Sequence, residues 1–369
     1  MGHARKLTRE EAEKQSDKTW YLPHHPVLNP NKPGKLCVVF DTAAKFSGTS
    51  LNDQLLQGPD YINNLAGILM RFRQEEVTLI ADIEKMFHQV RVPPEDCDAL
   101  RFLWWPEDLN HEPEEYQTQV HIFGATSSPC CSNKVRYGKQ AAETVHRNFY
   151  IDDLLKSTTS VEEVMTLADK LIGMLKEGGF RLTKFLSNRR EVLLTLPSQE
   201  RANPTLNLEL HRLPINCTLG LHWDAERDVF CFKTVSTNKP ATKHGVLSTI
   251  STLFDPLGLL SPFLLPVKVL IQELWKEKVE WDEKIQDHHL QVWKQWTSSL
   301  PLIELIQVPR CYRNPDMPNN GTVQPHLFSD ASEYAYSAVA YPRLDDHGGR
   351  VQCVFVLGKC RNAPLKRPT

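Results

Sequence analysis

The chain has 369 residues, of which 41% are hydrophobic and 24% are charged, as is usual for globular proteins. Its net charge of −2 excludes a strongly basic, nucleic-acid-coating protein, although a basic cleft within an acidic exterior is still compatible. The chain has nine cysteines without a CxxC pair and no secretory signal, which excludes a secreted disulfide scaffold. It has no unbroken apolar span, which excludes a membrane protein. We therefore expect an intracellular, cytoplasmic protein.

The first part of the chain predicts short strands and one helix. Residues 1–19 are charged and lack core residues, which favours a helical or frayed lead-in. The proline-rich stretch that follows is expected to be extended and rich in turns. Residues 36–41 and 77–83 have the pattern of strands, and residues 61–74 have the spacing of a helix.

The middle of the chain predicts a hairpin, two helices and further strands. FLWWP and VHIFG look like paired strands around the acidic loop EDLNHEPEEY, and a helix follows over 127–147. FYIDDLLKS predicts strand, turn and strand with the acidic pair at its bend. Residues 161–179 form a clear amphipathic helix that ends at Gly178-Gly179, and FRLTKFL and CTLGLHWD predict strands.

The last third changes character. Helical spacing dominates beyond Lys239, a Pro- and Asn-rich linker covers 313–320, and alternating residues then predict the strands of a new domain. The pattern indicates an α+β chain with an antiparallel core, a helical region and a terminal fragment.

Asp152 and Asp153 at the bend would repel each other if both were buried and ionised. A divalent cation explains such a pair, because Mg²⁺ prefers hard oxygen ligands and two ions can clamp a phosphoryl transfer. Asp82, after a buried strand, is the candidate third carboxylate. The alternative is a solvated bend at Asp152-Asp153 and a turn cap at Asp82.

These segments together resemble a known family. The order ADIEKMF, FGATSSP, FYIDD, GGFRLTK and TLGLHWD resembles motifs A to E of reverse transcriptases, and SLNDQLLQGPD, MFHQVRV and RFLWWP resemble the BEL/Pao retrotransposon polyprotein. The resemblance implies an α+β right-hand polymerase with an antiparallel palm sheet. Its expected parts are a lead-in (1–19), fingers and palm (20–235), a helical thumb or connection (236–312), a linker (313–320) and a truncated RNase H-like fragment (321–369).

The resemblance also implies site residues and partners. Asp82 and Asp152 would hold two Mg²⁺ ions, which Mn²⁺ can replace, with Asp153 as the second aspartate of the turn. Lys184 would donate a proton to pyrophosphate, although a surface lysine is nearly as compatible with the pattern. The implied substrates are an RNA or DNA template, a primer and dNTPs, and other parts of the polyprotein are possible partners.

Further positions match the substrate and primer sites of the family. Phe87 falls where such enzymes exclude the ribose 2′-OH, with a core phenylalanine as the alternative. Phe123, Gly124 and Ser128-Pro129 match the turn beside the incoming base pair. The hairpin that grips the primer is expected at Leu219, Gly220 and Trp223. Template contacts are expected from the basic residues Lys35, Lys45, Arg71 and Arg73.

Three features depart from the family. Cys37 stands where relatives have an arginine that holds the triphosphate, and Lys35 or Lys45 would compensate only in part. The interval 130–149 is shorter than the palm helix of relatives. Asp330 matches the first metal carboxylate of RNase H, Ser337 replaces a usual glycine, and we expect no RNase H activity from this chain.

Two alternatives to an active polymerase stay open. Cys37 and the short interval favour a catalytically impaired remnant with the same fold. An aspartic peptidase is a weaker alternative, suggested by VVFDTAA around Asp41, because that site needs two such loops and no D-T-G or D-S-G triplet occurs.

Overall fold

The computed structural model describes residues 2–14, 16–28, 34, 36–105, 110–128, 139–234, 239–314, 317, 321–346 and 348–364. The chain divides into two compact units. The first comprises Met1–Asn63, Asp82–Glu143 and Lys170–Thr183, and the second comprises Asn64–Ala81, Thr144–Asp169 and Lys184–Thr369. Within the described ranges, no helix combines the length and apolarity needed to cross a bilayer.

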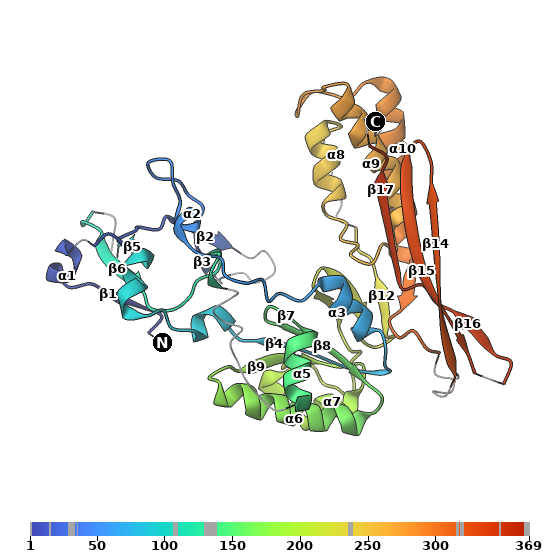
Figure 1. Ribbon diagram of the computed structural model, residues 1–369, viewed down its shortest axis with the longest axis horizontal. Coiled ribbons are helices and arrows are strands. Elements are labelled where there is room, and N and C mark those ends of the chain that lie inside the picture. Colours follow the sequence, from blue (N-terminus) through green and yellow to red (C-terminus); the bar gives the residue numbers. More distant parts are fainter. Residues whose placement is uncertain are drawn as a thin grey trace. The chain divides into compact units, whose positions relative to one another are not determined.

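The first unit holds a three-stranded sheet and a separate hairpin (Figure 1). The sheet has the order β1-β6-β5, and β2 pairs with β3. The elements of this unit are β1 (Ala4–Lys6), α1 (Arg9–Glu13), β2 (His24–Leu28), β3 (Leu36–Phe40), α2 (Leu51–Gln54), the 3-10 helices η1 (Met86–Gln89) and η2 (Pro94–Leu100), β5 (Arg101–Trp104) and β6 (Glu114–Thr118).

One expectation for this unit holds in part and another is wrong. The charged lead-in is helical over α1, but its start is not frayed, because β1 pairs with β6, Arg5 facing Gln117, and Leu7 is buried. The strand that pairs with β5 is β6 and not VHIFG, and β6 begins within the acidic loop. The buried Arg101 ties these parts together by donating hydrogen bonds to the Ala12 and Lys14 carbonyls at the C-terminal end of α1 and to Asp98.

The second unit begins with a four-stranded sheet of order β7-β8-β4-β9. Strands β4 and β9 each cross the boundary between the units. The expected hairpin, the amphipathic helix with its Gly178-Gly179 end and the strand at 77–83 are confirmed. The elements are α3 (Leu65–Phe72), β4 (Val77–Ile83), α5 (Lys139–Asn148), β7 (Phe149–Tyr150), β8 (Asp153–Thr158), α6 (Val161–Glu177), β9 (Leu182–Leu186), α7 (Arg190–Thr195) and η3 (Ser198–Glu200).

The remaining elements of the second unit form two more antiparallel sheets and a group of helices. β10 (Ile215–Thr218), β11 (Leu221–Asp224), β12 (Val229–Cys231) and β13 (Gln307–Pro309) make one sheet. The helices are α8 (Lys243–Ile250), α9 (Ser261–Lys276), α10 (Asp287–Ser299) and η4 (Leu300–Leu305). The last sheet contains β14 (Thr322–Ala331), β15 (Ala335–Asp345), β16 (Val351–Cys353) and β17 (Leu357–Asn362).

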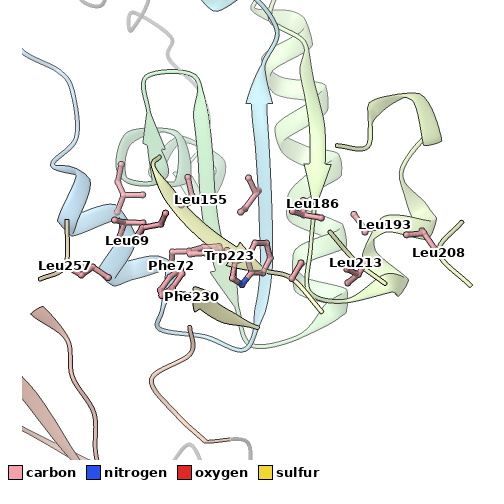
Figure 2. Close-up of a cluster of buried hydrophobic side chains, with 14 residues drawn as sticks. Leu69, Phe72, Leu155, Leu186, Leu193, Leu208, Leu213, Trp223, Phe230 and Leu257 are labelled. Carbon is pink, nitrogen blue, oxygen red and sulfur yellow. The ribbon is translucent and has the colours of Figure 1, made fainter. Parts of the chain in front are cut away.

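Among the described residues of the second unit, two apolar clusters join its sheets and helices. Figure 2 shows Phe72, Trp223 and Phe230 at the centre of the first, where α3 and the β11–β12 hairpin meet the sheet. Phe72 and Trp223 contact edge to face, with ring centroids 5.5 Å apart. The second cluster lies between α8, α9 and α10. α9 also joins the last sheet, since Asn362 donates to the Lys268 carbonyl and Gln272 donates to that of Ala363.

Candidate functional site

The acidic pair lies on the tight turn between β7 and β8. Tyr150 pairs with Asp153, so Ile151 and Asp152 alone make the turn, and both aspartates are half-buried. Ile151 has φ 58°, a conformation that β-branched residues rarely adopt and that costs about 1–3 kcal/mol. Leu154 and Leu155 directly behind the turn are buried. The core therefore holds the turn in a strained geometry that presents two carboxylates.

Asp82 lies near the end of β4, after a run of five buried residues, Val77–Ala81. Its side chain is half-buried, and its carbonyl accepts a hydrogen bond from the Thr183 hydroxyl at 3.4 Å. Asp82 belongs to the first unit, and Asp152 and Asp153 belong to the second. All three carboxylates offer the hard oxygen donors that fit a divalent cation such as Mg²⁺.

Phe87 and Phe123 are in contact in the first unit. Phe87 is buried in η1, and the two rings meet edge to face with centroids 4.6 Å apart. Phe123 is half exposed, so it is the ring of this pair that presents a surface to solvent.

Gly124 is held by two side chains that the sequence analysis did not identify. Thr42 Oγ1 and Asn52 Nδ2 both donate to its carbonyl, at 2.7 and 3.0 Å, and Asn52 Oδ1 accepts from the Thr126 amide. Gly124 has φ +96°, and an added Cβ would lie 3.2 Å from Thr42 Oγ1. The sequence motif SLND indicates the position of Asn52, because Ser50 and Asp53 form a capping box that fixes Asn52 in α2.

The residues near β3 are placed only in part. Cys37 is exposed on β3 opposite Val27, and Lys45 is exposed in the loop that follows. Asp41 Oδ1 accepts hydrogen bonds from the amides of Ala43 and Ala44, both at 3.0 Å. A turn therefore accounts for this carboxylate. Lys35 and Pro129 lie outside the described residues, as do residues 130–138 of the short interval.

The expected primer hairpin forms between β10 and β11. Thr218 pairs with Leu221, and Leu219 and Gly220 fill the turn with φ 50° and +81°. Positive φ at both positions matches the right-handed twist of the flanking strands. Trp223 is 1% exposed, and its Nε1 donates to Asp228 at 2.9 Å. Trp223 is therefore a core residue that packs close to the hairpin.

Arg73 is also corrected, from a template contact to a buried structural residue. It is 0% exposed and donates to the carbonyls of Pro309, Arg310 and Phe355. Its guanidinium lies 4.3 Å from the centroid of the Tyr312 ring, and burial lowers the pKa of Arg73. Arg71 donates to the Arg147 carbonyl, and burial lowers its pKa too.

The two remaining candidates are exposed. Lys184 lies on β9 with φ 55°. Asp330 lies on β14, where it pairs with Ser337 and its Oδ1 accepts the Ala331 amide at 2.9 Å. Lys359 and Arg361 on β17 line the same open depression as Asp330.

Comparison with known proteins gives a family match for the last third of the chain. Residues 242–369 match the family model described as the Pao retrotransposon-like RNaseH-like domain. The resemblance to Pao-type retrotransposons is confirmed. The matched residues include the helices α8 to α10 and the last sheet, which carries Asp330. No curated protein matches the chain.

Solved structures show the fold of this chain. The foamy viral protease-reverse transcriptase dRH in complex with double-stranded DNA is 15% identical, with a TM-score of 0.57 over 98% of this chain. The foamy viral protease-reverse transcriptase in complex with an RNA/DNA hybrid is 14% identical, with a TM-score of 0.57 over 99% of this chain. This chain covers 53% and 41% of those two chains. It thus has a mixed α/β fold like that of retroviral reverse transcriptase.

Proposed function

We propose that this chain provides the RNA-directed DNA polymerase of a Pao-type retrotransposon, with fingers, palm and thumb in the order expected from the motifs. Its substrates are a template, a primer 3′-OH and dNTPs. The strained turn that presents Asp152 and Asp153 carries the proposal, because such strain persists where the surrounding structure maintains it and clusters at active sites. The strand order supports it, since β8 with Asp153 lies beside β4, which leads into Asp82.

Each group has a defined task in this proposal. Asp82 and Asp152 hold the metal, and Asp153 adds negative charge at the same turn. Two bound Mg²⁺ ions would activate the 3′-OH and stabilise the leaving pyrophosphate. Phe123 and the Gly124 backbone face the nucleotide, Phe87 supports Phe123 from below, and Lys184 donates a proton to pyrophosphate. The Leu219-Gly220 turn contacts the primer.

Primer extension on poly(rA)/oligo(dT) with Mg²⁺ or Mn²⁺ tests the proposal. Asp152→Asn removes one charge from the metal site without changing the size of the side chain, and incorporation should fall to the level without enzyme. Asp169→Asn is the matched control, because Asp169 is an exposed carboxylate on α6. Incorporation by this variant should equal that of the wild type. Equal incorporation by wild type and Asp152→Asn would exclude this role for Asp152.

The second candidate is an impaired remnant, which the exposed Cys37 favours because a neutral thiol makes no charge-assisted contact to phosphate. Cys37→Arg separates the two candidates. If the site is otherwise intact and lacks only the arginine that relatives have at position 37, Cys37→Arg should lower the KM for dNTP. Absence of incorporation by wild type and by Cys37→Arg, both folded, would favour the remnant.

A further inference from the structure

The end of α9 and the start of α10 bring together a group of side chains that the polymerase chemistry does not use. One ligand atom from each of Glu277, His288 and His289 lies within 4.8 Å of the other two. Among the described residues, no other set of three His, Cys, Asp or Glu side chains meets this criterion. Two imidazoles and a carboxylate form a donor set that suits Zn²⁺.

The local fold explains why these side chains meet. His288 and His289 occupy the first turn of α10, which begins at Asp287. Glu277 is the residue that caps the C-terminus of α9, and Glu273 precedes it by one helical turn. The two helices pack through the apolar cluster that includes Leu274 and Trp293. The carboxylates and imidazoles are therefore fixed on two helix ends that the core already holds together.

His289 has the surroundings of a metal-binding histidine. Its side chain is 3% exposed, and its Nε2 lies 3.0 Å from Glu277 Oε2. Its other nitrogen, Nδ1, lies 3.7 Å from Glu273 Oε2. A metal-binding histidine commonly directs its second nitrogen toward a carboxylate, which fixes the tautomer and the orientation of the ring. Glu273 is placed to do this for His289.

We propose that Glu277, His288 and His289 bind one Zn²⁺ ion, with His289 contributing Nε2 and Glu273 orienting its ring. Ligand atoms around tetrahedral zinc lie about 3.4 Å apart, given zinc–ligand distances near 2.1 Å. The three atoms need to approach each other by at most about 1.4 Å, and two of the side chains, Glu277 and His288, are exposed and can adjust. Water would complete the coordination. The ion would join α9 to α10 and stabilise the helical region; this inference does not rest on the polymerase proposal.

The competing arrangement is metal-free. In it, His289 carries a proton on each nitrogen and bridges Glu273 and Glu277 as an imidazolium ion. His288 distinguishes the two arrangements, because zinc needs its imidazole and the imidazolium bridge does not. His288 is exposed, so its substitution should leave the fold intact.

Isothermal titration of the full chain with Zn²⁺ under reducing conditions tests the site. Wild type should bind one ion that His288→Ala binds at least tenfold more weakly. His244→Ala is the matched control, because the exposed His244 pairs with a carboxylate, Asp282 at 3.3 Å, and lies outside the group of three. It should bind like wild type. Equal affinity for wild type and His288→Ala would overturn the proposal, as would an equal loss in His244→Ala.

Two further measurements separate this site from cysteine binding and from misfolding. Co²⁺ bound at the site should give tetrahedral d–d absorption without a thiolate charge-transfer band, and a thiolate band that His288→Ala leaves unchanged would assign the ion to cysteines and overturn the proposal. Saturating Zn²⁺ should raise the Tm of wild type by about 5 °C or more and that of His288→Ala by much less. An equal rise in both would also contradict the proposal.

Discussion

Arg310 is predicted to be among the most sensitive positions of the fold. Its side chain is 0% exposed and makes a bidentate ion pair with Asp228, at 2.6 and 2.8 Å. The same guanidinium donates to the carbonyls of Phe72, Glu75 and Glu76 at 2.5–2.9 Å. One arginine after β13 therefore satisfies the end of α3, the segment before β4 and the β11–β12 turn.

Arg310→Ala removes all of these donors at once. Breaking a buried ion pair by deleting one partner costs about 3–5 kcal/mol. The Asp228 side chain is 24% exposed, so water can relieve part of its charge, and we place the ion-pair loss near the lower end of that range, at about 3 kcal/mol. The carbonyls of Phe72, Glu75 and Glu76 also lose their donor, so the total loss in free energy of unfolding should be no smaller than the ion-pair loss. Against a typical free energy of unfolding of about 5–15 kcal/mol, the loss is large.

Urea unfolding followed by tryptophan fluorescence measures the effect. Trp223, one of eight tryptophans in the chain, donates to the same Asp228, so part of the emission comes from this region. The control is Arg343→Ala, which breaks a 3.0 Å ion pair with Asp345 whose side chains are 31% and 25% exposed. Partly exposed pairs of this kind contribute about 1 kcal/mol or less. Similar losses in free energy of unfolding in the two variants would refute the argument that the burial of Arg310 determines its contribution to stability.

The other predictions concern the turn at Gly220, the helix α6 and the N-terminal helix α1. Gly220→Ala should lower the free energy of unfolding by about 1–2 kcal/mol, because φ is +81° and the new Cβ would lie 2.3 Å from Phe254 Cδ1. Gly173→Ala, in open space on α6, should instead raise it by about 0.5–1 kcal/mol, and equal changes in thermal unfolding would contradict both assignments. The hydrogen bond from Arg5 and the capping box with Thr8 lower the pKa of Glu11 to about 2. Since its folded pKa is lower than its unfolded pKa, its contribution to stability is present above pH 4.5 and is lost as the pH falls toward 2. An NMR titration should show this pKa rising in Arg5→Ala, and a wild-type midpoint near 4.5 would contradict the prediction.

Features that depend on neighbouring residues could be predicted from the sequence. The hairpin around Asp152 and the amphipathic helix α6 follow from residue patterns over fewer than about 20 residues, and the resemblance to reverse transcriptases implied the hairpin at Leu219 and Gly220. The resemblance to Pao-type retrotransposons also came from the sequence, through the motif order, and the family match supports it for residues 242–369. The roles of the candidate site residues stay predictions.

Only the tertiary structure decided which charged residues are buried. Arg73 looked like a template contact because a cation is usually solvated, but carbonyls from Pro309, Arg310 and Phe355 enclose it. The lead-in looked frayed because its partner β6 lies more than 100 residues away, as in the pairing of Arg5 with Gln117. In both cases the deciding groups are hydrogen-bond acceptors and donors of the distant backbone. Every residue type carries those groups, so the local sequence pattern contains no signal for them.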